Sequence, residues 1–420
     1  MIGLAVLLAV VFLYGLISRR LEGSVITAPM SFVAAGMVLG PAALGLVNFD
    51  LENETVLLVA EFALALLLFT DATRVDLRAL GSPPHLPARL LGVGMPLTIV
   101  LGAVAAALVL PGLSFWEAAI VAAVLAPTDA ALGQAVVSDE RVPATVRRSL
   151  NVEAGLNDGL SVPFLALFIA LALAEEEALT GGWWILFALQ QIGFGALVGA
   201  LVGASGAWLV REAIRWGWIS DTFERLALLT LALFAYALAG LAGGNGFIAA
   251  FAGGLCAEPF LRGIGERTVG FADTEGQLLN AAVFFTFGAV AIPLLLDEMD
   301  LSVALYAGLS LSVIRMLPVG IALLGTRLRG VSVLFMGWFG PGGLASIILG
   351  LVFLEGAASL SASVEILTVV AATVLLSVLL HGLTSSPLST LYARSAATMS
   401  PAAPEQMSHP ENTAGQEARR

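Results

Sequence analysis

The chain has 420 residues, of which 59% are hydrophobic and only 12% are charged. A soluble domain carries about 25% charged residues, so this composition excludes a soluble globular protein and predicts one polytopic membrane domain. The net charge of −12 comes without any basic cluster, and so no nucleic-acid partner is expected. The single cysteine, Cys256, excludes an internal disulfide.

Apolar runs near the length that crosses a bilayer recur along the whole chain. At roughly 20 residues for each crossing, we expect about thirteen spans, at residues 2–18, 25–45, 55–75, 88–110, 115–137, 147–174, 183–210, 222–242, 244–259, 275–296, 301–325, 331–354 and 363–385. The predicted fold class is therefore an all-α polytopic membrane protein. Residues 1–385 form its transmembrane domain, and 386–420, rich in Ser, Pro, Ala and Glu, form a disordered cytoplasmic tail.

The loop charges predict the orientation of the chain in a cell inner membrane. Arginines follow the odd-numbered spans and acids follow most of the even-numbered ones. The positive-inside rule then places the N-terminus outside and the C-terminus in the cytoplasm. Arg19 and Arg20 follow the first apolar run instead of preceding it, so this run is expected to span the membrane and not to be a cleaved signal.

Two expected spans are interrupted at matching places. The fifth is broken at Pro127, and the twelfth at Gly340, Pro341, Gly342 and Gly343. The two breaks lie seven spans apart, so the interrupted helices run in opposite directions. This pattern predicts inverted six-helix repeats, spans 1–6 and 8–13, whose interrupted helices cross at a transport site near the bilayer midplane. The alternative for the glycines is tight helix packing or a kink.

Polar residues lie in the third and fifth spans. Asp71 closes the apolar run of the third span and is expected at the site or at its cytoplasmic entrance, with an ordinary interfacial acid beside Arg74 as the alternative. Glu61 has no evident partner. In the fifth span, Thr128 offers a carbonyl or hydroxyl ligand to a cation. Asp129 either lies against the positive end of a helix dipole or caps the broken helix.

The sixth span contains Glu153, Asn157 and Asp158 in an otherwise apolar helix. A carboxylate at membrane depth costs several kcal/mol and usually lines an ion or proton path. Because a proton and a cation each stabilise a different form of the same carboxylate, their binding to Asp158 is mutually exclusive. Asp158 and Thr128 are the expected ligands of the transported ion, which indicates a cation site coupled to protons.

Arg315 is the one arginine well inside an expected span, and a buried guanidinium needs an anion. Glu153 is its expected partner, in a structural ion pair. The three histidines, His85, His381 and His409, are expected in loops, at a helix end or in the tail, so no histidine proton relay is predicted.

These segments resemble the monovalent cation:proton antiporter family, in its bacterial Na⁺/H⁺ exchanger (NhaP-like) branch related to animal sodium/proton exchangers. The most specific motifs are Pro127-Thr128-Asp129 and the run from Glu153 to Asp158. The resemblance implies a homodimer in which a six-helix core moves against an interface domain. It also implies that Asp158 carries the ion or proton and that Asn157 holds the broken fifth helix. Gly342 stands where many relatives have arginine, and Ala154 where some have serine.

The function expected from these residues and this resemblance is electroneutral antiport of Na⁺ or Li⁺ against H⁺, by alternating access at Asp158. No nucleotide-binding motif is present and no cofactor is expected, so ion gradients across the surrounding lipid membrane would drive transport. K⁺/H⁺ antiport by the same residues is the alternative. A channel fits the paired helix breaks less well. An intramembrane aspartyl protease using Asp129 and Asp158 is a remote alternative, because neither residue has the Gly-x-Gly-Asp context.

Overall fold

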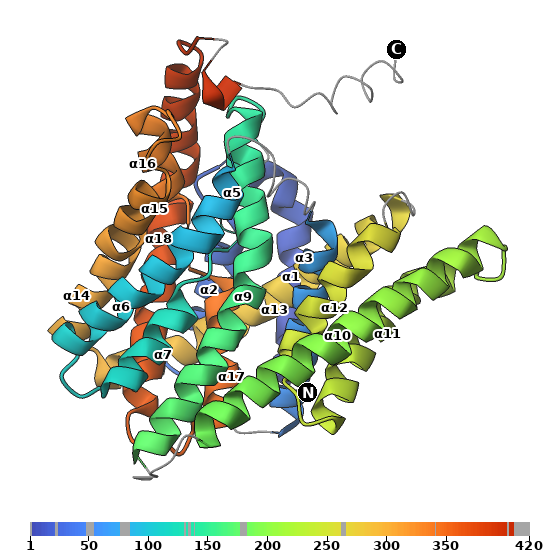
Figure 1. Ribbon diagram of the computed structural model, residues 1–420. Helices are drawn as coiled ribbons and strands as arrows, with labels where there is room; N and C mark the ends of the chain where they lie inside the picture. The colour runs from blue at the N-terminus through green and yellow to red at the C-terminus, as the bar shows by residue number, and fades with distance from the viewer. Residues whose placement is uncertain are drawn as a thin grey trace.

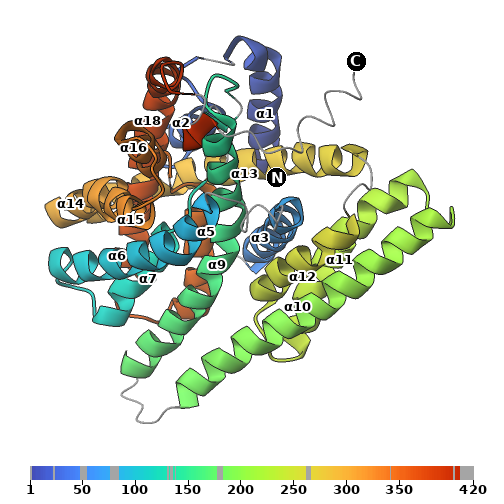
Figure 2. The same cartoon turned by 45° about the horizontal axis from the view of Figure 1, so that its top comes forward.

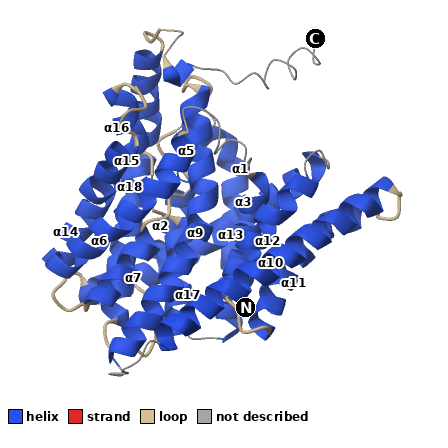
Figure 3. Ribbon diagram, in the orientation of Figure 1, coloured by secondary structure: helices blue, strands red, loops and turns tan. Residues whose placement is uncertain are grey.

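The computed structural model describes residues 2–21, 24–47, 54–75, 85–129, 132, 136–137, 139–176, 183–261, 266–340, 342–400 and 403–406. Across these residues the chain is helical, with loops and turns between helices and no strand (Figure 3). Eight of the described helices are long and apolar enough to cross a membrane, and four more are apolar but shorter. The chain is an all-α, multi-pass membrane protein.

The first six expected spans coincide with described helices: α1 (Ile2–Leu21), α2 (Ala28–Leu39), α3 (Glu54–Arg74), the continuous α5–η1–α6 (Leu86–Arg89, Leu90–Gly94, Met95–Val109), α7 (Phe115–Leu125) and α9 (Ala144–Glu176). The later spans coincide with α10 (Trp183–Arg215), α11 (Asp221–Leu241), α12 (Gly246–Leu261), α13 (Glu266–Glu298), the continuous α14–η2–α15 (Leu301–Leu309, Ser310–Ile314, Arg315–Ala322), the pair α16 and α17 (Gly330–Trp338, Leu344–Ala357) and α18 (Ser363–Ala396).

Helices α3, α10, α11 and α12 lie together on one side of α9, and α5, α6, α14, α15 and α16 lie on the other (Figures 1 and 2). Small residues allow the closest helix contacts. A Cβ at Gly199 or Gly203 of α10 would collide with the backbone of Ala249 or Gly253 of α12. Lipid supplies little hydrophobic drive between helices, so close backbone approach is what holds such a pair together.

The repeat expected from the two helix breaks has a second structural mark. The fourth span contains a π-helical segment, η1, and the eleventh contains another, η2. They lie seven spans apart, as the two breaks do, and π segments inside α-helices frequently occur at functional positions. Pro341, one of the expected break residues, lies outside the described residues.

The C-terminal helix corrects two expectations. The tail was expected to begin at residue 386, but α18 continues to Ala396. The reason is tertiary packing: Tyr392 is buried, its ring stacks on Phe335 with centroids 4.1 Å apart, and its hydroxyl donates to Ser332. His381 is consequently not at a helix end. It is buried within α18, and its Nε2 lies 2.9 Å from the carbonyl oxygen of Trp338.

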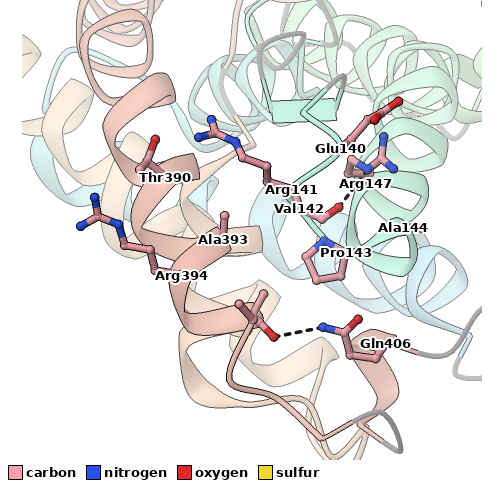
Figure 4. Close-up of a pocket in the computed structure, with 12 residues that line it drawn as sticks. Glu140, Arg141, Val142, Pro143, Ala144, Arg147, Thr390, Ala393, Arg394 and Gln406 are labelled. Atoms are coloured by element: carbon pink, nitrogen blue, oxygen red, sulfur yellow. Dashed lines mark hydrogen bonds between the residues drawn. The ribbon is translucent and has the colours of Figure 1, made fainter.

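A short 3₁₀ turn, η3 (Pro404–Gln406), folds back onto the same region. Glu405 is buried there and accepts from the Arg329 backbone N–H and the Ser332 hydroxyl, both at 2.8 Å, at the start of α16. Gln406 donates to the carbonyl of Ala396, as Figure 4 shows. Beside it, a cavity of about 700 Å³ is lined by residues at the start of α9 and near the end of α18.

Two of the arginines that line this cavity have local partners. Arg141 pairs with Asp139 at 2.7 Å, which holds the pKa of that carboxyl below its usual range. Arg147 donates to the carbonyl of Val142 (Figure 4). The contacts of Glu405 and Gln406 therefore hold η3 against the start of α16 and the end of α18.

We expect Glu405→Ala to lower the apparent melting temperature of the detergent-solubilised protein, because the first turn of α16 loses its side-chain acceptor. Loss of such a cap costs on the order of 1 kcal/mol. Glu298→Ala, at an exposed residue that ends α13, is the matched control. Equal melting of the two variants would show that the docked segment does not stabilise the fold.

Candidate functional site

The fifth span is interrupted directly after α7. This helix begins with a capping box between Ser114 and Glu117 and ends at Leu125, before Pro127. Thr128 and Asp129 follow in an unwound turn and are both buried. The amide nitrogen of Asn157, on α9, donates to the Thr128 hydroxyl at 2.6 Å. Asn157 therefore joins the sixth span to the break in the fifth.

Asp129 reaches across to the other interrupted span. Its Oδ2 accepts from the backbone N–H of Leu344, the first residue of α17, at 2.8 Å. A Cβ on Gly343 would collide with the Asp129 carboxylate, so glycine is needed there for this approach. The negative charge thus faces the positive end of the α17 dipole. Sequence reasoning considered a dipole contact for Asp129, but only the fold identifies which helix supplies it.

Glu153 and Arg315 form a buried ion pair beside this crossing. Arg315 Nη2 lies 2.6 Å from Glu153 Oε1, and their side chains are 6% and 2% exposed. Arg315 directly follows η2, whose extra residue per turn changes the direction in which the next side chain leaves the helix. A Cβ on Gly340 would collide with the guanidinium. Gly340 therefore lets Arg315 pass close to the broken twelfth span.

Asp158 lies on α9, next to Asn157, and is 8% exposed. Its Oδ1 is buried and accepts no hydrogen bond from the protein. Burial first, and then the negative charges of Asp71 and Asp129, disfavour a charge on Asp158. A carboxylate in this position favours a bound proton or cation.

Asp71 occupies the edge of this group. It is half-buried near the end of α3, and its Oδ1 lies 3.9 Å from Arg74. The absent side chain of Gly155 allows α3 to approach α9, since a Cβ there would lie 3.1 Å from Val75 and 3.8 Å from the Asp71 carbonyl. The interfacial arginine of the alternative interpretation is present, and the role of Asp71 at the site or its entrance stays a prediction.

The expected residues thus fall into two sets. The first set lies around the crossing, the place where the breaks of the fifth and twelfth spans meet: Thr128, Asp129, Asn157, Asp158 and, at its edge, Asp71. The second is the Glu153–Arg315 pair with Gly340. Gly342, where the resemblance led us to expect arginine, is closely packed: a Cβ there would lie 3.3 Å from the Ser346 hydroxyl and 3.9 Å from the Leu125 carbonyl.

Two residues near these helices have features that sequence reasoning missed. Glu61 of α3 accepts from the Tyr236 hydroxyl of α11 at 2.7 Å, across 175 positions of sequence, so no local pattern identifies the pair. Ser161 of α9 is fully buried, and its hydroxyl makes no hydrogen bond with the protein. Its spacing of three residues from Asp158 was a signal available in the sequence.

The chain matches the family model described as "Sodium/hydrogen exchanger, transmembrane" over residues 6–391. It is 27% identical over 259 residues to a probable Na(+)/H(+) antiporter of Schizosaccharomyces pombe, covering 58% of this chain and 34% of that protein. It is 26% identical over 338 residues to the K(+)/H(+) antiporter NhaP of Alkalimonas amylolytica, covering 80% of this chain and 57% of that protein. The chain therefore spans only part of the length of these relatives.

The fold is similar to that of the sodium proton antiporter MjNhaP1 from Methanocaldococcus jannaschii. The TM-score is 0.73 at 20% identity, covering 93% of this chain and 98% of the other. This likeness concerns the fold, and the family model independently covers nearly the whole chain. The chain belongs to the sodium/hydrogen exchanger family of transmembrane proteins.

Proposed function

We propose that the chain is a secondary antiporter that exchanges a monovalent cation for H⁺. The observation that carries the proposal is Asp158: a buried carboxylate on a membrane helix, beside two crossing interrupted helices, with one oxygen free of protein hydrogen bonds. Membership of the sodium/hydrogen exchanger family supports the same function.

The surrounding charges indicate why Asp158 is the exchanging group. Asp129 is stabilised by the N-terminus of α17, and Glu153 by Arg315. Both carboxylates therefore have fixed partners in the protein. Asp158 is repelled by its neighbours and is stabilised either by a proton or by a cation. Alternation between these two forms, with the site opened to one side at a time, couples cation to proton.

Na⁺ or Li⁺ is the proposed cation, with Thr128 and Asp158 among its ligands. K⁺ is the second candidate, because the NhaP relative aligned with 80% of this chain is a K(+)/H(+) antiporter. Ion selectivity depends on cavity size and on the number of ligands. Proteoliposomes with an imposed pH gradient, compared in Na⁺, Li⁺ and K⁺, distinguish the two candidates.

The membrane arrangement is part of the same proposal. The chain lies in the inner membrane with its N-terminus outside, supported by arginines after the odd-numbered spans. It acts as a homodimer, in which a core that contains the crossing moves against an interface domain. Cross-linking in native membranes and protease access from each side test these two points.

We expect Asp158→Asn to abolish exchange while the protein still folds and inserts, because asparagine cannot alternate between a protonated and a charged form. The measurement is dissipation of an imposed pH gradient in proteoliposomes. Asp297→Asn, at an exposed acid in the last turn of α13, is the matched control. Cation-dependent dissipation at the unmodified rate in Asp158→Asn would remove Asp158 from the mechanism.

Glu153→Ala is expected to destabilise the protein more than it alters ion preference, because it leaves the buried Arg315 guanidinium without its anion. Removing one partner of a buried pair costs about 3–5 kcal/mol. The double variant Glu153→Ala with Arg315→Ala should recover part of the lost thermal stability. A double variant that melts no higher than the worse single variant would contradict the structural role of the pair.

Exchange is expected to be electroneutral. Protonated Asp158 and cation-bound Asp158 are both formally neutral, Asn157 has no titratable group, and Glu153 is paired with Arg315. The moving site then carries the same charge in both directions, so membrane potential does not drive it. A transport rate that follows a valinomycin-clamped potential would overturn this prediction, as it would if Asp129 or Asp71 took up a second proton in each cycle.

A further inference from the structure

Ser161 is a buried serine on α9, one turn beyond Asn157 and Asp158. Its exposure is 0%, and its Oγ has no hydrogen-bond partner in the protein. A hydroxyl in the hydrocarbon region without a partner is costly, and buried polar groups in native proteins nearly always have one. The Ser161 hydroxyl is therefore expected to bind a partner that is not part of the protein.

The usual solution for a hydroxyl on a membrane helix is to donate to the carbonyl four residues earlier. This chain uses that solution repeatedly: Thr98 donates to Gly94, Ser149 to Thr145 and Thr373 to Val369, at 2.7–2.9 Å. Ser149 lies on the same helix as Ser161. Ser161 does not form this bond, so its hydroxyl stays available to a ligand.

The position of Ser161 on α9 directs it toward the site. At about 100° per residue, Ser161 lies about 40° round the helix from Asn157 and about 60° from Asp158, between the two. Three buried oxygens on this face have no protein hydrogen-bond partner: Asn157 Oδ1, Asp158 Oδ1 and Ser161 Oγ. The Asn157 amide nitrogen is engaged by Thr128, which leaves its oxygen available on this side.

Two other buried serine hydroxyls in the described residues also lack a partner, and both are on other helices. Ser389 is in the C-terminal part of α18, close in sequence to Tyr392. Ser346 is in the first turn of α17, where a Cβ on Gly342 would lie 3.3 Å from its oxygen. Of the three, Ser161 is the one that shares a helix face with Asp158.

We propose that Ser161 is a ligand of the transported cation, contributing a neutral hydroxyl oxygen beside the Asp158 carboxylate. The proposal rests on the proposed function and extends it to a residue that binds the cation but not the exchanged proton. A small monovalent cation that sheds water on entering the site needs several oxygen ligands. A proton on Asp158 needs no oxygen ligand from Ser161. The hydroxyl therefore affects binding of the cation and not of the proton.

The test compares the full-length chain with Ser161→Ala, Ser161→Thr and Ser149→Ala in proteoliposomes. The last variant is the matched control, because Ser149 is buried on the same helix with its hydroxyl engaged by Thr145. For Ser161→Ala we expect the apparent KM for Na⁺ to rise about tenfold, which corresponds to about 1.4 kcal/mol of binding free energy. The maximal rate should remain within about twofold, while Ser161→Thr, which keeps a hydroxyl, should retain a lower KM than Ser161→Ala.

A binding measurement on purified protein makes the result independent of transport. Na⁺ that binds the folded protein raises its melting temperature. We expect this Na⁺-dependent rise to be reduced in Ser161→Ala and retained in Ser149→Ala, with the melting temperatures in Na⁺-free buffer unchanged. A purely structural role for Ser161 would instead lower the Na⁺-free melting temperature and leave the rise intact.

The outcomes separate this proposal from the proposed function. If the unmodified chain exchanges cations for protons and Asp158→Asn does not, but Ser161→Ala has the KM and the Na⁺-dependent stabilisation of Ser149→Ala, the Ser161 proposal alone is overturned. If the unmodified chain shows no exchange with Na⁺, Li⁺ or K⁺, the proposed function is overturned and the Ser161 proposal with it.

Discussion

The carboxylate of Asp129 accepts the first backbone N–H of α17, and this contact ties the two interrupted spans together. The rest of the site depends on it. It holds the turn containing Thr128 in place, from which Thr128 accepts the Asn157 amide and so positions α9. In hydrocarbon, neither the anion nor the exposed helix end would be tolerated alone, and each stabilises the other.

Charge compensation explains why several acids at similar depth do different work. Glu153 has a guanidinium at 2.6 Å, and Asp129 has a helix N-terminus. Asp158 has neither, and its neighbours repel its charge. In the proposed mechanism the acids with fixed partners are structural, and Asp158 is the one that exchanges a proton for a cation. The proposed ligand role of Ser161 follows the same logic for a neutral oxygen.

Backbone irregularities bring these groups within reach of one another. Gly340 and Gly343 provide the space into which the Arg315 guanidinium and the Asp129 carboxylate fit. The π segment η2 immediately precedes Arg315, and η1 lies at the matching place in the other repeat. The sequence left two interpretations of these glycines, a helix break or tight packing. Both apply, because the side chains of Arg315 and Asp129 pack against glycine backbone at the break.

Much of this protein was determined by the sequence alone. The hydrophobic runs predicted the spans, since a bilayer imposes a length on any helix that crosses it, and the rarity of charge at membrane depth singled out Asp158, Glu153 and Arg315. Only the tertiary structure decided which helix end faces Asp129, that Tyr236 donates to Glu61, and that α18 continues past residue 385 to pack Tyr392 on Phe335. Periodicity and composition describe one segment at a time, whereas these contacts join segments far apart in the chain and arise only when the helices pack.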